Sequence, residues 1–415
     1  MSPLRAASLF AVASLGAGCG PEAPTPPAGV DVPEGPCGHA LYVLSSDYQS
    51  TNVSVLGWDG VVLSDSIVSS ASRAPGLSVA LSGDVTAPTD RTSSGEIVVL
   101  DRYPAAALTF VDPTTATVRD QLSLQTGFAS NPQDYLEVAP DKAYVTRYAA
   151  NPEPGREPFD EGSDVLIIDP SSATISGRID LQAAMAGAED GILPRPSRLV
   201  ATEDTVFALL SAYSLDFSRS GEGRVAAIDP QGDQLLSFVE LTGARGCASL
   251  ALSSSGSRLA VGCSGTFGGT STPTIEDAAV LVFDVAGAEL SLVARWSAQE
   301  LGGDPLGLSL DFVSDGELLL STLGRLDDEG EQVRPDRLLA LSIEDGATRE
   351  LLRSDGAPFT LGDVRCEAAC GACFVADADH GAVQRVNIVD GRAEGSEAVV
   401  LDDGIGLPPR YLGAY

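Results

Sequence analysis

The segment Leu108-Thr-Phe-Val-Asp112-Pro-Thr-Thr-Ala-Thr decides the fold, because the chain repeats its pattern several times. An apolar run ends in Asp-Pro, a tight turn follows, and a second run of strand-forming residues begins. This pattern is typical of a β-hairpin, since Asp, Pro and Gly favour turns and apolar runs of this length favour strands. Further clear copies begin at Val165, Val225 and Val280, and weaker ones lie at 53–62, 339–349 and 383–393.

A second hairpin precedes these copies, for example at 135–146, 196–210, 248–262 and 308–321, so each unit holds four strands. The aspartates Asp112, Asp169, Asp229 and Asp284 mark the turns and are spaced 57, 60 and 55 residues apart. Seven units over 37–415 give about 54 residues per unit. The sequence therefore predicts an all-β fold, a seven-bladed β-propeller of four-stranded antiparallel blades. Six or eight blades are the alternatives, because the first two units are the least regular.

The two ends of this region complete one blade. The first unit begins at 40–46, which matches the second strand of the other units, so its innermost strand is missing. The C-terminal segment 408–415 starts with prolines, like other innermost strands, and can supply it. We expect this C-terminal strand to close the ring and to remove open sheet edges.

The hairpins x-Leu-x-x-Ser-x-x-Gly followed by Val-x-Val-Ile-Asp resemble those of YVTN/YncE-like and lactonase-like seven-bladed propellers. The resemblance covers nearly all of 37–415 and implies the fold. It does not imply one activity, because a single fold hosts many functions.

The N-terminus is typical of an export signal. Arg5 precedes an apolar run at 6–15, which is too short to span a bilayer, and small residues lead to Cys19. The segment Gly16-Ala-Gly-Cys19 resembles the bacterial lipobox, although Gly16 stands where that family favours Leu. The resemblance implies a signal peptide at 1–18, lipidation of Cys19 and, since Gly20 follows, an outer-membrane lipoprotein. An ordinary secretory signal is the alternative. The proline-rich segment 19–36 predicts a tether, and the anchor would face the periplasm or the exterior.

Six cysteines follow Cys19, and an even number in an exported chain predicts disulfides. Cys247 and Cys263 are symmetric about one hairpin turn, and Cys366 and Cys373 about another, so each pair should lie across two strands. Cys37 then remains for Cys370, where a bond would link the first and seventh units. The run Cys366-x-x-x-Cys370-x-x-Cys373 resembles a metal-binding motif, but we favour the disulfides.

The chain carries a net charge of −33, which excludes nucleic acid as a partner and argues against a basic membrane-binding surface. We expect a monomer that contacts the membrane through its lipid only. No nucleophile motif or zinc motif occurs, so no catalytic residue is predicted. The turn Asp377-Ala-Asp379-His380-Gly381 resembles the start of a calcium loop but lacks its other ligands, so a polar turn is favoured, with calcium as the alternative. His39 is expected to pack or to lie at the surface.

The longest loops join the second and third strands of a unit and lie at 149–163, 212–224, 264–278 and 324–337. In a propeller these loops emerge on one face, where function often lies. We interpret the chain as a non-catalytic scaffold that binds an envelope protein, another macromolecule or a ligand through this face. The alternative is a lactonase-like or quinoprotein-like enzyme with a metal near the central tunnel. The residues predicted for the binding face are Arg156, Asp160, Asp216, Arg219, Asp327, Asp328, Arg334 and Arg337.

Overall fold

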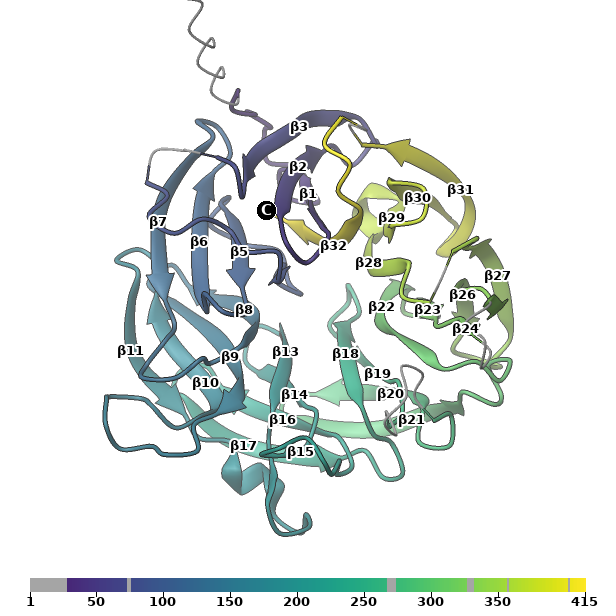
Figure 1. Cartoon of the computed structure of the whole chain (residues 1–415). Coiled ribbons are helices and arrows are strands. Elements are labelled where there is room, and N and C mark those ends of the chain that lie inside the picture. Colours follow the sequence, from purple (N-terminus) through teal and green to yellow (C-terminus); the bar gives the residue numbers. More distant parts are fainter. Residues whose placement is uncertain (1–27, 73–75, 267–273, 327–331, 357, 402–403) are drawn as a thin grey trace, which may run out of the picture.

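The computed structural model describes residues 28–72, 76–266, 274–326, 332–356, 358–401 and 404–415. It is an all-β molecule in which seven four-stranded antiparallel sheets follow one another around an axis (Figure 1). The predicted seven-bladed propeller is therefore confirmed. Within the described residues, no helix is long and apolar enough to cross a membrane.

In each blade the four strands follow one another from the axis outward, in the order in which they are named. Blades 1 to 4 are β32 (Pro409–Ala414), β1 (Leu41–Ser46), β2 (Thr51–Leu56), β3 (Val62–Ser69); β4 (Val85–Thr86), β5 (Ile97–Asp101), β6 (Ala107–Asp112), β7 (Thr117–Ser123); β8 (Pro132–Ala139), β9 (Lys142–Ala150), β10 (Gly162–Asp169), β11 (Thr174–Ile179); and β13 (Pro196–Ala201), β14 (Val206–Leu210), β16 (Arg224–Asp229), β17 (Gln234–Glu240).

Blades 5 to 7 complete the ring and are β18 (Cys247–Leu252), β19 (Arg258–Cys263), β20 (Ala279–Ala286), β21 (Glu289–Ser297); β22 (Leu306–Ser314), β23 (Glu317–Thr322), β26 (Arg337–Ser342), β27 (Thr348–Arg353); and β28 (Leu361–Glu367), β29 (Ala372–Asp377), β30 (Ala382–Val389), β31 (Arg392–Val400). Small ladders join β12 (Ile192–Leu193) to β15 (Tyr213–Ser214) and β24 (Arg325–Leu326) to β25 (Gln332–Arg334), and the short 3-10 helices are η1 (Gln182–Met185) and η2 (Ala368–Cys370).

The ring closes as the sequence predicts. The C-terminal strand β32 pairs antiparallel with β1, so that Leu41 lies opposite Ala414 and Tyr42 opposite Gly413. A side chain at Gly413 would collide with the ring of Tyr42, which lies over this glycine. The hydroxyl of Tyr42 donates a 2.7 Å hydrogen bond to the carbonyl oxygen of Val98 in blade 2. The C-terminal strand thus completes blade 1 by backbone pairing with β1, and Tyr42 of β1 bonds the same blade to blade 2.

The core lies between the blades, and this explains the apolar runs. Among the described residues, seven buried clusters each join two adjacent blades. On β10, Val165 packs toward blade 4 while the next residue, Leu166, packs toward blade 2. Because successive side chains of a strand point to opposite faces, a strand covered on both faces needs apolar residues throughout. The inner strands therefore read as continuous apolar runs.

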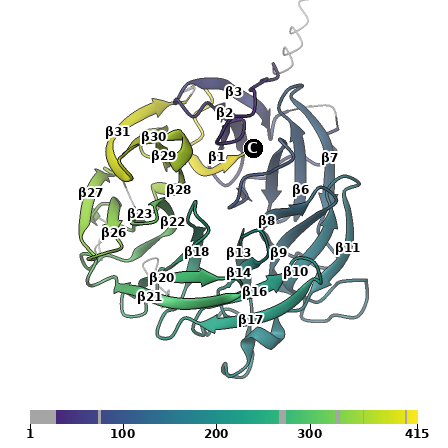
Figure 2. The same ribbon diagram turned by 180° about the vertical axis from the view of Figure 1, so that it is seen from behind.

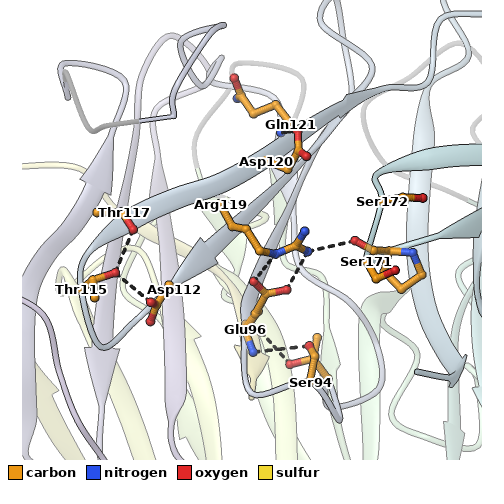
Figure 3. A network of polar contacts seen from close by, with 12 residues as sticks. Ser94, Glu96, Asp112, Thr115, Thr117, Arg119, Asp120, Gln121, Ser171 and Ser172 are labelled. Carbon is orange, nitrogen blue, oxygen red and sulfur yellow. Dashed lines mark hydrogen bonds and ion pairs between the residues drawn. The ribbon is translucent and has the colours of Figure 1, made fainter. Parts of the chain in front are cut away.

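The repeated aspartate organises the outer turn of a blade. The carboxylate of Asp112 accepts a hydrogen bond from the backbone N–H of Thr114 at 2.8 Å and another from the Thr115 hydroxyl (Figure 3). At the fourth residue after the aspartate, Ala116 has a left-handed backbone with φ of 53°, which turns the chain into the next strand. Nearby, Arg119 donates to both carboxylate oxygens of Glu96 and also to a carbonyl oxygen of blade 3. The marker aspartates are therefore structural.

Three disulfide bonds join the six cysteines that follow Cys19, in the pairs expected from the sequence. Cys247–Cys263 and Cys366–Cys373 each link the first and second strands of one blade. Cys37–Cys370 links the segment before β1 to the turn after β28, across 333 residues. Since all six sulfurs are bonded, none is free for the metal-binding alternative.

The part of the predicted tether that the structure describes lies against the propeller. The backbone N–H of Val30 donates a 2.7 Å hydrogen bond to the carbonyl oxygen of Pro113. Val30 and Val32 also pack on the cluster between blades 1 and 2. These two apolar side chains give residues 28–36 a surface to bury, so this stretch is not a free spacer. The signal peptide and Cys19 lie outside the described residues.

Antiparallel strands give the propeller two distinct faces (Figure 2). The turns between first and second strands, and those between third and fourth strands, lie on one face, which we call the mouth face. The connections between second and third strands and those between blades lie on the other, the long-loop face. The C-terminus and the Cys37–Cys370 bond belong to the mouth face, because they join β32 to β1 and lie at the turn after β28.

Candidate ligand site on the propeller axis

A cavity of about 650 Å³ lies on the axis, enclosed by the innermost strands and open at the mouth face. Its rim carries exposed turn residues such as Arg91, Glu203 and Ser254, and its wall is formed by β13, β18, β22, β28 and β32. Its volume is in the range of small-molecule binding sites. Apart from Glu367 at the end of β28, the charged residues of its wall are Asp90, Arg198, Asp311, Asp363 and Arg365, which we call the axial charges.

Backbone N–H groups hold the axial carboxylates in place. Asp311 on β22 accepts hydrogen bonds from the N–H of Phe312 and from the N–H of Cys366 on β28, both at 2.7 Å. Asp363 on β28 accepts from an N–H of β32 at 3.2 Å. Asp90, in the turn after β4, is hydrogen-bonded by the backbone N–H of Ala201 on β13. Each carboxylate thus bonds a blade other than its own and orders the inner strands.

Carbonyl oxygens hold the two axial guanidinium groups in a similar way. Arg365 donates to the carbonyl oxygens of Pro88 and Thr89 in blade 2, at 3.2 and 3.1 Å. Arg198 donates to the carbonyl oxygens of Gln133 and Ala248, in blades 3 and 5. Both side chains therefore bond blades other than their own, and their positions are fixed by the backbone.

The axial charges make no ion pair within 4.0 Å with one another or with any other described residue. Elsewhere in the blades the chain does form tight pairs, such as the buried pair of Arg147 and Asp164 at 2.7 Å. The axial carboxylates and guanidinium groups thus face the same small cavity without neutralising each other directly. Such a site offers fixed charges of both signs to a ligand.

Limited hydration makes the charged state of these carboxyl groups unfavourable. Burial raises the pKa of Asp311 to about 7 and that of Asp90 to about 6. It also raises the pKa of Asp363, and the nearby guanidinium groups of Arg198 and Arg365 act in the opposite direction. Perturbed carboxyl groups in a concave site are a common property of functional sites.

The residues predicted for the binding face lie in loops of blades 3, 4 and 6. Most of those that the structure describes bond groups of their own or a neighbouring loop. The buried carboxylate of Asp160 accepts hydrogen bonds from three backbone N–H groups of its loop, which lower its pKa. Arg156 is exposed and, among the described residues, its side chain forms an ion pair only with a glutamate three residues away. Asp216 accepts hydrogen bonds from serines of its own loop, which lower its pKa to about 2.

The remaining described residues predicted for the long-loop face also bond groups of the protein. Arg219 forms an ion pair with Glu189 and bonds the carbonyl oxygen of Asp190. Arg334 and Arg337 converge on the buried carboxylate of Asp304, each at 2.5 Å. Asp327 and Asp328 lie outside the described residues. The structure therefore brings Arg334 and Arg337 together at one carboxylate, whereas Asp160 and Asp216 bond groups of their own loops, so the long-loop binding face stays a prediction.

The two histidines have structural partners. The ring of His39 stacks on Tyr415 at 5.7 Å, next to the ring closure. His380 bonds the buried carboxylate of Asp377 at 2.9 Å, and this bond raises the pKa of the imidazole. Within the described residues, no three His, Cys, Asp or Glu side chains are arranged to hold a metal ion. The turn at Asp377–Gly381 is thus a hydrogen-bonded polar turn in this structure, and the calcium alternative stays a prediction.

The fold and this axial cavity define the class of the molecule as a seven-bladed β-propeller with a polar axial pocket. No protein-family model matches the sequence, and no curated protein matches it. Solved structures do resemble it. The propeller domain of Cps50 (Swd1) from Myceliophteria thermophila has a TM-score of 0.56 and 10% identity, covering 88% of this chain and 96% of that one.

Two bacterial structures, each provisionally described as a 6-phosphogluconolactonase, are similar as well. The one from Bacteroides uniformis has a TM-score of 0.53 and 14% identity over 90% of this chain and 98% of its own. The one from Bacteroides fragilis has a TM-score of 0.52 and 10% identity over 90% and 96%. At these identities the likeness shows the propeller fold alone. The lactonase-like resemblance is therefore confirmed for the fold.

The axial charges were not among the residues predicted from the sequence. One signal was present, because Arg198, Asp311, Asp363 and Arg365 each place a charge next to an apolar residue in the first strand of a unit. First strands face the axis in a propeller, so charges there point toward a shared centre. Reading the first strands together across units would have found four of the five residues.

Proposed function

We propose that this chain is an envelope-tethered binding protein whose principal site is the axial cavity. The observation that carries this proposal is the set of axial charges, which face one 650 Å³ cavity and make no direct ion pair among the described residues. Fixed polar groups in an otherwise enclosed pocket orient a small ligand and give it specificity. The long-loop face then remains free for a second, macromolecular contact, as the sequence predicts.

The test is a comparison of ligand retention between two tryptophan variants of the same turn. Ser254 is exposed at the rim of the cavity, so Ser254→Trp places an indole in the mouth. Ser257 lies three residues further along the chain, is also exposed and does not line the cavity, so Ser257→Trp is the matched control. Protein is incubated with the small polar molecules of a bacterial envelope extract, desalted and analysed by mass spectrometry.

We expect the wild type and Ser257→Trp to retain the same molecule and Ser254→Trp to lose it. Equal retention by Ser254→Trp, or no retention by the wild type, would refute the axial site. Conversion of a lactone by the purified protein, abolished in Asp311→Asn, would replace the binding function by the enzymatic alternative. Each result is read against circular dichroism spectra that show the variants to be folded.

The proposed address rests on the sequence of the first 36 residues. The apolar run at 6–15 and the small residues before Cys19 support cleavage at this cysteine and its lipidation. Expression in a bacterium fed with labelled palmitate should label the protein, and Cys19→Ser should remove the label. An unlabelled wild type would show that the chain is secreted by an ordinary signal instead.

A further inference from the structure

The axial charges specify the kind of ligand that the cavity accepts, provided that the proposed binding function holds. We propose that the ligand is a zwitterion, an amino acid or short peptide that brings both an ammonium group and a carboxylate. Its ammonium group lies against the carboxylates of Asp311 and Asp90, and its carboxylate against the guanidinium groups of Arg365 and Arg198.

The backbone keeps the opposite axial charges apart. Asp311 and Arg365 lie on the adjacent strands β22 and β28 and influence each other electrostatically. They nevertheless form no ion pair, because Asp311 is bonded by two backbone N–H groups and Arg365 by two carbonyl oxygens of blade 2. Neither side chain needs to move to release a partner, so both charges are available to a ligand.

The mixed charges of the cavity disfavour ligands that carry a single charge. An amine would be attracted to the axial carboxylates but would bring its positive charge near Arg198 and Arg365. A simple carboxylate would approach these arginines but would face Asp90, Asp311 and Asp363. Because a charge is costly to desolvate unless it is matched, a molecule with both charges gains at both ends. The serine hydroxyls at 253–255 line the same cavity and suit the peptide groups of a short peptide.

Proton exchange on binding should identify the ligand class independently of affinity. Burial raises the pKa of Asp311 to about 7, and the charged groups that face it are Arg365 and Glu367. An ammonium group bound beside Asp311 favours the ionised carboxylate and lowers its pKa. Binding of a zwitterion at pH 7 should therefore release protons. A carboxylate bound alone should cause uptake instead, because negative charge near Asp311 raises its pKa.

The experiment uses titration calorimetry at pH 7 with 4-aminobutyrate, triglycine, butylamine and butyrate. The first two are zwitterions, and the last two carry one charge each on a chain of similar length. At least one zwitterion should bind ten times more tightly than butylamine and butyrate, and titrations in buffers of different ionisation enthalpy should show proton release. These measurements use the wild-type protein and do not depend on how a variant folds.

Two variants locate the contacts. Asp311→Asn should weaken zwitterion binding about tenfold and abolish proton release, while Asp141→Asn, at an exposed carboxylate between the first and second strands of blade 3, should change neither. Arg365→Gln should weaken the zwitterion to the affinity of butylamine. Butylamine or butyrate binding as tightly as the zwitterions would overturn this inference and leave the axial binding site intact. If no probe binds while the wild type still retains an extract molecule that Ser254→Trp loses, the ligand class is wrong and the site stands.

Discussion

The disulfide between Cys37 and Cys370 offers the sharpest test of the closed ring. Replacing both cysteines by serine removes a bond across 333 residues, whereas the pair Cys247–Cys263 spans only 16. In the chain-entropy model a disulfide stabilises by restricting the unfolded chain, and the effect grows with the logarithm of the loop. For these two loops the model gives losses of about 6 and about 3 kcal/mol on removal.

The structure supplies the control for local damage. The bond Cys366–Cys373 lies in the same turn region as Cys370 but closes a loop of 7 residues, for which the model gives about 2 kcal/mol. A purely local effect would make the losses at Cys370 and at Cys366–Cys373 similar. If the effect is entropic, the loss of unfolding free energy in the three double-serine variants should increase with loop length and be largest for Cys37–Cys370.

The assay is equilibrium unfolding in guanidinium chloride under non-reducing conditions. Trp58 packs against Phe374 at 5.9 Å between blades 1 and 7, so in a Trp296→Phe background, which removes the other tryptophan, its fluorescence reports on the closure itself. Far-ultraviolet circular dichroism follows the remaining blades. An equal loss of unfolding free energy in the Cys37/Cys370 and Cys247/Cys263 variants would refute the reasoning, because loop length would then have no influence.

Three further predictions concern buried polar groups. Arg147→Met removes the closer of two guanidinium partners of the buried Asp164 carboxylate, leaves the ion pair with Arg178 at 3.6 Å, and should cost about 3 kcal/mol. Arg156→Ala, at an exposed pair, should cost less than about 1 kcal/mol in the same denaturant titration. Tyr42→Phe leaves the carbonyl oxygen of a blade 2 strand without its donor and should cost about 1–2 kcal/mol in thermal unfolding, and an unchanged midpoint would contradict the role of this bond. Because burial raises the pKa of Asp311 from 3.8 to about 7, the folded state binds the extra proton and wild-type stability should fall as pH rises through this window. Asp311→Asn should lack this loss, so that the variant gains on the wild type between pH 4 and 7, and parallel curves would refute the shifted pKa.

The fold could be predicted because its determinants are local. Asp112 and its counterparts form the same hydrogen-bonded turn in successive blades, so the repeat is visible at a nearly constant spacing. Cysteine pairs symmetric about a turn could be assigned for the same reason, since cross-strand register follows from the hairpin. Closure by 408–415 followed from counting strands, because only one innermost strand was missing.

The binding site could not be predicted in the same way because its residues are distant in the chain. Asp90 and Arg365 are separated by 275 positions and come together through the ring, so no motif spacing records them. The binding face was predicted at the loops instead, because they are long and charged. In the structure, however, carboxylates such as Asp160 and Asp304 are occupied by groups of their own or neighbouring loops. Charge in a loop sequence therefore says little about what remains available to a partner.

The path of the N-terminal segment relates the axial cavity to the proposed membrane anchor. Val30 is bonded to the turn at Pro113, which joins the third and fourth strands of blade 2 and so lies on the mouth face. Ala28 follows Cys19 by nine positions, and a stretch of this length can span at most about 30 Å. A lipid on Cys19 would thus hold the rim of the mouth face close to the bilayer and direct the long-loop face away from it. Ligands would then enter the cavity from the space next to the membrane, whereas macromolecular partners would meet the long loops on the opposite side, so the two predicted contacts need not compete.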